Sequence, residues 1–268
     1  MHLKRWITGL VALPILIFLV YAGGIAFALL VSAAGVVALW EYNRIVLDPA
    51  LAGVSGLIVR WGYVPGVAIV WSAHWMGVEL VFSLVALNLV VIALMSMFHF
   101  KADPAVLRVI VHQLQGTIYI PVLLSFLILI RAGDSGMSWI FLLMAIVFAG
   151  DTSAYYVGSY WGRHKLSPAI SPGKTIEGSA GGLAANLAVG AIGKALFFPA
   201  LPWPVSILFF LAVGAAGQIG DLFESEMKRY SGIKDSSNIL PGHGGILDRI
   251  DALLFASPVA YVFIRFIL

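Results

Sequence analysis

Charged residues in the second half of this chain gather in three short stretches, at residues 149–182, 220–238 and 240–258. Before Asp151 the acidic residues are few and scattered. Each stretch borders an apolar segment long enough to be membrane-embedded, where ionisable groups are costly and usually serve a function. We therefore expect the chemistry of this protein to reside in these three stretches.

Three aspartates have the spacing of a divalent-cation site. Asp248 and Asp251 are three residues apart, so on a helix their carboxylates share one face. Asp221 lies across the intervening loop, at the end of the preceding apolar segment. Hard oxygen ligands of this kind suit Mg²⁺, which shares its coordination with substrate phosphates. The alternative is a solvated network in which these acids only pair with nearby cations, namely Lys228, Lys234 and Arg249.

Two glycine-containing segments could bind phosphate. Gly242–Gly245 (GHGG) runs into an apolar helix, and backbone N–H groups at such a helix start favour anions. SPGKT (171–175) places Lys174 beside a possible helix cap at Thr175, although its spacing is not that of a P-loop. A tight turn and a membrane anchor are the respective alternatives. Asp151, with Tyr155 one turn later, is either a ligand or a buried hydrogen-bond partner.

The composition identifies the elements that must position these residues. Of 268 residues, 61% are hydrophobic and 11% are charged, far from the roughly 25% charged residues of soluble domains. Spans need about 20 mostly apolar residues. We therefore predict an all-α, polytopic integral membrane protein with about eight or nine transmembrane helices. The candidates are residues 6–22, 24–42, 54–73, 77–98, 117–131, 137–157, 177–197, 204–223 and 251–268.

The chain divides into an N-terminal span region, 1–135, and a catalytic region with cytoplasmic loops, 136–268. A retained first span is favoured over a cleaved signal peptide, because no polar mature region follows it. Residues 102–116 read as an amphipathic helix on the bilayer surface, and Glu41 and Glu79 as interfacial. The absence of cysteine excludes disulfides, thiolate metal sites and cysteine nucleophiles.

The polar stretches are predicted to share one side of the membrane. Two spans joined by FFPALPWP (197–204) separate the 158–176 loop from the 224–248 loop, so the chain returns to the side that it left. Both loops are basic, and the positive-inside rule assigns them to the cytoplasm. The predicted site thus faces cytosolic nucleotides.

The segment SEMKRYSGIKDSSNILPGHGGILDRID (225–251) resembles the signature of phosphatidate cytidylyltransferases, also called CDP-diacylglycerol synthases. GDTSAYYVG (150–158) and SPGKTIEG (171–178) resemble further blocks of that family, whereas the N-terminal half resembles it only in hydropathy. Gly173 stands where many relatives carry a second lysine. The resemblance implies the reaction of CTP with phosphatidate to give CDP-diacylglycerol and pyrophosphate.

The resemblance also implies roles for individual residues. It makes Asp221, Asp248 and Asp251 the metal ligands, for Mg²⁺ with a second cation such as K⁺. Catalytic roles fall to Lys228, Arg229, Lys234, Asp235, His243 and Arg249. Substrate binding falls to Asp151, Tyr155, Ser171, Lys174, Thr175, Glu177, Ser225, Gly244 and Gly245. The implied partners are CTP, phosphatidate, the lipid bilayer of the bacterial inner membrane and a second copy of the chain, with no nucleic acid.

Two rival functions predict different features. A transporter would place polar residues near the bilayer midplane, whereas these residues gather at span ends on one side. Another CTP-dependent lipid enzyme, a polyprenol kinase or an ether-lipid cytidylyltransferase, would share the nucleotide and metal residues and differ in the apolar half.

Overall fold

A computed structural model describes residues 2–47, 52–101, 104–240, 242 and 244–268, without the side chains of residues 2–9, 11 and 52–55. It is helical throughout apart from one β-hairpin, which confirms the all-α prediction. The chain forms two compact units: unit 1 is residues 1–132 and 235–248, and unit 2 is residues 133–234 and 249–268. The division into 1–135 and 136–268 remains a prediction, and by compactness residues 235–248 belong with the N-terminal helices.

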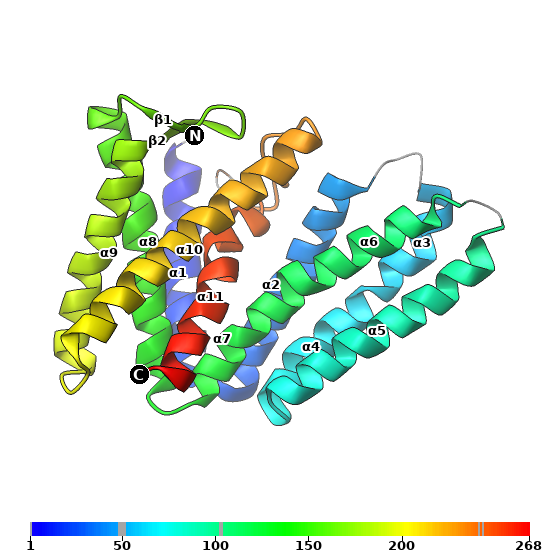
Figure 1. The fold of residues 1–268 in the computed structure, drawn as a ribbon, viewed down its shortest axis with the longest axis horizontal. Coiled ribbons are helices and arrows are strands. Elements are labelled where there is room, and N and C mark those ends of the chain that lie inside the picture. Colours follow the sequence, from blue (N-terminus) through cyan, green and yellow to red (C-terminus); the bar gives the residue numbers. More distant parts are fainter. Residues whose placement is uncertain (1, 48–51, 102–103, 241, 243) are drawn as a thin grey trace. The chain divides into compact units, whose positions relative to one another are not determined.

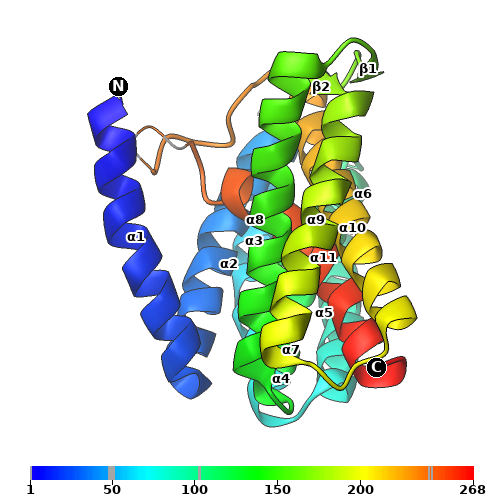
Figure 2. The ribbon, with the colours of Figure 1, turned by 90° about the vertical axis from the view of Figure 1, so that its left-hand side faces the viewer.

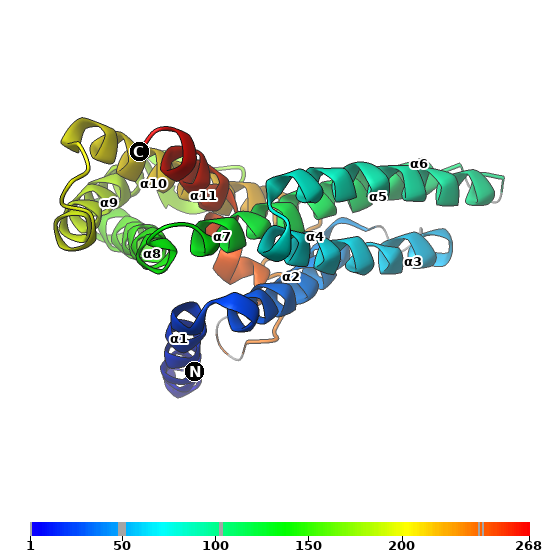
Figure 3. The same cartoon turned by 90° about the horizontal axis from the view of Figure 1, so that it is seen from below.

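Unit 1 is a bundle of apolar helices. Its elements are α1 (His2–Ala22), α2 (Gly24–Val46), α3 (Ala52–Trp61), α4 (Tyr63–Trp75), α5 (Val78–His99), α6 (Val106–Thr117), the π-helix η2 (Ile118–Val122) and α7 (Leu123–Ala132). Helices α3, α4, α5 and α6 lie side by side (Figure 3), and α2 packs against α4, α6 and α7. The core includes the fully buried side chains of Tyr42, Ile58, Ile69 and Ile92.

Unit 2 consists of α8 (Gly136–Trp161), the hairpin β1 (Lys165–Ser167) and β2 (Ser171–Thr175), α9 (Ile176–Phe197), α10 (Trp203–Tyr230) and most of α11 (Leu247–Phe266). Helices α8 and α9 run side by side, and α10 crosses them obliquely (Figure 1). Glycine permits the close approach: a Cβ at Gly178 would lie 2.7 Å from the carbonyl oxygen of Ala154 and 3.1 Å from Cα of Gly158. This contact joins the start of α9 to α8.

Seven helical segments among the described residues are long and apolar enough to cross a membrane. They are Gly24–Val46, Gly56–Trp75, Val78–His99, Val106–Ala132, Gly136–Trp161, Ile176–Phe197 and Trp203–Tyr230. This confirms the predicted polytopic membrane protein, and the count of seven applies to the described residues only. Helix α11 is not among these segments because it is too highly charged. Any 18 consecutive residues of it include at least three of the four charged residues Asp248, Arg249, Asp251 and Arg265.

The structure joins the described part of the predicted surface helix at residues 102–116 to the span that follows it. Helix α6 continues through η2 into α7, so that Val106–Ala132 forms one candidate span of 27 residues. Pro121 lies within η2. Proline has no backbone N–H group to donate to the helix, and the π-helical turn is the local irregularity at this point. One polar side chain of α6 meets another helix instead of water: Gln113 is buried and exchanges hydrogen bonds with Asn88 of α5.

The two ends of unit 2 differ in character. The β-hairpin and the end of α10 lie at one end, and the α9–α10 turn lies at the other (Figures 1 and 2). At the first end, the Arg229 side chain at the end of α10 donates to the carbonyl of Ile170 in the hairpin, at 3.2 Å. The two basic loops of unit 2 therefore meet on one side, as the span count predicted.

Candidate active site

A pocket of about 420 Å³ opens at the hairpin end of unit 2. Helix α8, the hairpin with the start of α9, and α10 each form part of its wall. The polar side chains in that wall are Asp151, Tyr155, Ser159, Ser171, Lys174, Thr175, Ser179, Gln218 and Asp221. Six of these are residues that the sequence analysis selected: Asp151, Tyr155, Ser171, Lys174, Thr175 and Asp221. The fold therefore brings parts of two separate polar stretches into one cavity.

An ion pair lies inside this pocket. The ammonium of Lys174, on β2, is 2.7 Å from Oδ2 of Asp221, on α10. Both side chains remain partly accessible, with 26% and 35% of their surface exposed. Ser225, one turn after Asp221, donates a long hydrogen bond of 3.5 Å to its Oδ1 atom. Because both groups face the same cavity, the ammonium is placed where it could bind an anion such as phosphate, and the carboxylate where it could bind a cation.

Gln218 and Ser179 form a part of the pocket that the sequence analysis missed. Nε2 of Gln218 donates to the backbone carbonyl of Ser179 at 3.0 Å, and the Ser179 hydroxyl donates to Oε1 of Gln218. This double contact ties α10 to α9 just below Asp221. Gln218 lies three residues before Asp221, so its position on the same helix face was the available signal.

Acidic groups of unit 2 concentrate around the pocket. Asp251, on α11, lies within electrostatic range of Asp221 and Asp151, and Lys228 acts on it with the opposite sign. Asp151 in turn experiences the charges of Lys174 and Arg249. Asp251 is largely buried and its Oδ1 atom accepts from its neighbour's backbone N–H. Negative and positive charges are thus interleaved, as a site for anionic phosphates and a cation requires.

These carboxylates fit a divalent metal by chemistry. They supply hard oxygen donors, and the Lys174 ammonium against Asp221 shows that the space before this carboxylate favours positive charge. Among the residues that the structure describes, no three acidic or histidine side chains are already grouped tightly enough to hold an ion. These oxygen donors suit a metal ion chemically, but in the described part of the chain they are not close enough together to hold one.

The hairpin is fixed by two residues of the SPGKTIEG stretch. The Thr175 hydroxyl caps α9 by accepting from the N–H of Gly178 at 3.0 Å. Glu177 does not line the pocket: its carboxylate accepts from the backbone N–H of Arg163 at 3.0 Å and contacts Nδ1 of His164 at 2.6 Å. Both residues thereby hold β1 and β2 over the start of α9, which places Ser171 and Lys174 at the cavity.

Two predicted catalytic cations at the end of α10 have structural contacts. Lys228 is buried and forms an ion pair with Glu224, one turn earlier. Arg229 donates from Nη1 to the carbonyl of Ile233 at 3.2 Å, in addition to its bond to the hairpin. Lys234 and Arg249 are exposed. Neither Lys228 nor Arg229 is among the residues that line the described pocket.

The remaining predicted residues lie in the unit 1 segment 235–248. Oδ2 of Asp248 accepts from the backbone N–H and the hydroxyl of Ser236, at 3.1 and 2.9 Å, and from the N–H of Gly245 at 2.8 Å. Gly244 has a φ of 82° and its carbonyl accepts from Leu240 N–H at 2.9 Å. Asp235 is exposed. His243 lies outside the described residues.

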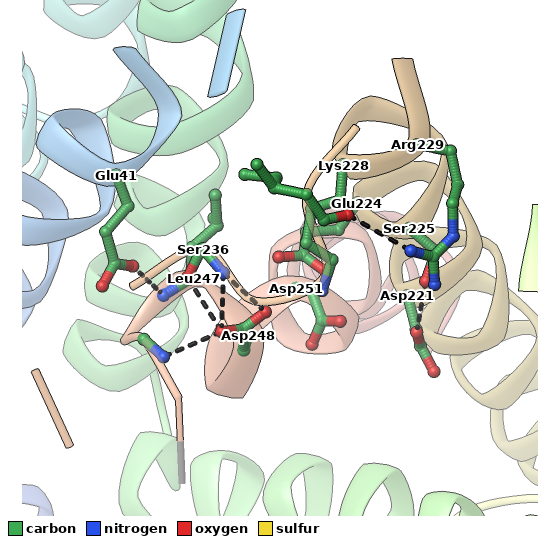
Figure 4. A network of polar contacts seen from close by, with 12 residues as sticks. Glu41, Asp221, Glu224, Ser225, Lys228, Arg229, Ser236, Leu247, Asp248 and Asp251 are labelled. Carbon is green, nitrogen blue, oxygen red and sulfur yellow. Dashed lines mark hydrogen bonds and ion pairs between the residues drawn. The ribbon is translucent and has the colours of Figure 1, made fainter. Parts of the chain in front are cut away.

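Glu41 on α2 is the largest departure from the sequence interpretation. Predicted to be interfacial, it is fully buried, and its carboxylate binds the segment that carries Asp248 (Figure 4). Its partners follow it by about 200 positions in sequence. The only local signal was an isolated acid within an apolar segment, VVALWEYNRIV, and such a residue is usually retained for a purpose.

Comparisons with known proteins cover nearly the whole chain. The profile of the cytidylyltransferase family matches residues 3–267. A phosphatidate cytidylyltransferase of Bacillus subtilis (strain 168) is 35% identical over 262 residues, 96% of each chain. One from Staphylococcus aureus (strain COL) is 33% identical over 259 residues, 95% of this chain and 96% of the relative. The chain therefore belongs to the cytidylyltransferase family.

Proposed function

We propose that this protein is a phosphatidate cytidylyltransferase, which converts CTP and phosphatidate into CDP-diacylglycerol and pyrophosphate. The observation that carries the proposal is the pocket between the hairpin, the start of α9 and the second halves of α8 and α10, where Lys174 pairs with Asp221 and Asp151 lies in the same wall. It occurs in a chain that matches the family from end to end. The relatives named above carry this activity in their names.

The reaction needs charge control more than proton transfer. A phosphate oxygen of phosphatidate attacks the α-phosphorus of CTP, and the bond from that phosphorus to the bridging oxygen breaks as pyrophosphate leaves. A phosphate monoester has a second pKa near 6, so the nucleophile is already ionised at neutral pH. Repulsion between two anions is the main obstacle, and positioned positive charge lowers it.

The pocket supplies a cation and polar groups for binding. Lys174 would contact a CTP phosphate as a point charge. Asp151, Tyr155, Ser171 and Thr175 lie in the same wall and would orient the nucleotide. Glu177 and Ser225 would act indirectly, through the hairpin and through Asp221.

A divalent cation, Mg²⁺, belongs to the proposal, with a second cation such as K⁺ beside it. Asp221, Asp248 and Asp251 would hold the metal, as the sequence pattern predicts. When bound, it supplies positive charge that neutralises the phosphates. The charge of Arg249 acts on Asp151 in the structure. This supports a role for the Arg249 guanidinium beside the phosphates. The proposed catalytic roles of five further residues rest only on the sequence motif: Lys228, Arg229, Lys234, Asp235 and His243.

The substrates explain the location at span ends. Phosphatidate is held in the bilayer by its acyl chains, about 0.8 kcal/mol for each buried CH₂, while its phosphate lies at the interface. A site at the end of membrane helices can receive that phosphate and a soluble nucleotide together. We place the protein in the bacterial inner membrane as a homodimer, with the pocket on the basic, cytoplasmic side.

Isotope transfer tests this function. Purified protein receives phosphatidate, Mg²⁺ and CTP labelled at either the α- or the γ-phosphate. We expect lipid-bound label only from the α-position, together with one pyrophosphate per CDP-diacylglycerol. Label entering lipid from the γ-position, with a polyprenol as acceptor, would instead establish a kinase.

A further inference from the structure

The carboxylate of Glu41 is surrounded by donors from one distant segment. Oε1 accepts from the Ser237 hydroxyl at 2.5 Å and from the N–H of Ile246 at 3.0 Å. Oε2 accepts from the N–H of Leu247 at 2.6 Å (Figure 4). Glu41 is 0% exposed. A buried carboxylate is costly unless hydrogen bonds replace its hydration, and here three donors do so. All four residues belong to unit 1.

Glu41 occupies the position of a helix cap. Leu247 is the first residue of α11, and the first N–H groups of a helix have no partner within it. An anion there also interacts favourably with the helix dipole. The cap comes from α2 instead of the preceding residue, so within unit 1 Glu41 holds residues 246 and 247 against α2.

Asp248 secures the same segment through a second set of bonds. It binds Ser236 and Gly245, which lie on either side of the turn. A Cβ at Gly245 would collide with the Ser236 hydroxyl and with Oε1 of Glu41. The two carboxylates and the glycine therefore fit one arrangement of the described residues 236–240 and 244–248.

We infer that Glu41 is a positioning residue for the reaction: it fixes the segment that carries Asp248, Gly244 and Gly245. This inference rests on the proposed function, because that function gives those residues their roles. Glu41 binds Ser237, Ile246 and Leu247, and it would act through these residues. The sequence interpretation placed it at the membrane interface, without a role in the site.

The first test measures local order in the full-length protein in lipid nanodiscs. Glu41→Gln preserves size and replaces one accepting oxygen with an NH₂ group that faces a backbone N–H. Hydrogen exchange should accelerate in peptides covering 236–248 and stay unchanged in peptides from α8 and α9. The matched control is Glu79→Gln, because Glu79 is an exposed acid near the start of α5. Unchanged exchange at 236–248, or acceleration throughout the chain, would overturn the inference.

The second test measures turnover in the same preparations. Glu41→Gln should lower kcat roughly 10- to 100-fold, the usual effect of removing a partner that orients a ligand, with KM for CTP close to wild type. Glu79→Gln should match wild type. A Glu41→Gln enzyme with wild-type kcat would contradict a positioning role.

Ser237→Ala provides a milder change that keeps the carboxylate. It removes one donor and should lower kcat less than Glu41→Gln does. The double variant should fall short of the product of the two single effects, because both act through one contact. Fully multiplicative effects would overturn the inference. If the wild type makes no CDP-diacylglycerol, the proposed function fails, and the exchange data alone decide whether Glu41 orders the segment.

Discussion

At the scale of single residues, the Lys174–Asp221 pair is the central feature of the pocket. Each group neutralises the other at 2.7 Å, and both are partly accessible. In the proposed reaction Asp221 binds a metal and Lys174 binds a phosphate, so both must release each other.

Replacing Lys174 should therefore change two affinities in opposite directions. Lys174→Met removes a phosphate contact and should raise KM for CTP about tenfold, since a hydrogen bond to a charged group contributes about 1.5–3 kcal/mol and each 1.4 kcal/mol is tenfold. It also removes the competitor for Asp221, so Mn²⁺ titrated by electron paramagnetic resonance should bind more tightly. Lys165→Met, an exposed cation of the same hairpin outside the pocket, should change neither. Weaker Mn²⁺ binding would contradict this exchange.

Sequence patterns predicted the residues that line the pocket better than they predicted the residues that hold neighbouring segments in place. Lys174 and Asp221 stood out because charge is rare in this chain. Glu41 did not, because its donors are backbone N–H groups and a serine roughly 200 residues later, which no local pattern encodes. Lys228 shows the converse: its charge suggested a phosphate ligand, but in the structure it pairs with Glu224.

At the scale of elements, the hairpin and three helices build the pocket through close backbone contacts. Hydropathy predicted α8, α9 and α10 within a few residues at most ends, because the 3.6-residue period and span length govern them. It did not predict β1 and β2, which are short and polar. Their position depends on Thr175 and Glu177 contacts, which form only when α9 is in place.

The contact of α9 with α8 predicts a glycine requirement. Gly178→Ala would place a methyl group 2.7 Å from the Ala154 carbonyl oxygen, and forcing such a group into a packed interface costs about 1–3 kcal/mol. Thermal unfolding of the full chain should shift to lower temperature. Gly217→Ala is the matched control, because its Cβ would meet its nearest neighbours at an ordinary 3.7 Å. Equal melting temperatures for the two variants would contradict close α8–α9 packing.

At the scale of the whole molecule, we expect the two ends of unit 2 to lie on opposite sides of the membrane. The hairpin end carries the pocket and the basic loops, and the α9–α10 turn lies at the opposite end (Figure 1). The chain has no cysteine, so introduced cysteines report their location without background.

Single cysteines at Ala169 and Ala200, both exposed, mark the hairpin and the α9–α10 turn. In intact bacteria, a membrane-impermeant maleimide should label Ala200→Cys and leave Ala169→Cys unmodified until the membrane is permeabilised. The reverse pattern would place the pocket outside the cytoplasm and away from CTP.

The central claim is that the unit 2 pocket performs cytidylyl transfer with Asp221 as a metal ligand and not as a base. The most direct measurement compares phosphatidate-dependent pyrophosphate release by the wild type, Asp221→Asn and Glu226→Gln. Glu226 is an exposed acid of the same helix outside the pocket. We expect wild-type rates from Glu226→Gln and a loss of at least about 100-fold from Asp221→Asn, at pH 7 and at pH 9 alike. Wild-type activity in Asp221→Asn, or its recovery at pH 9, would contradict the claim.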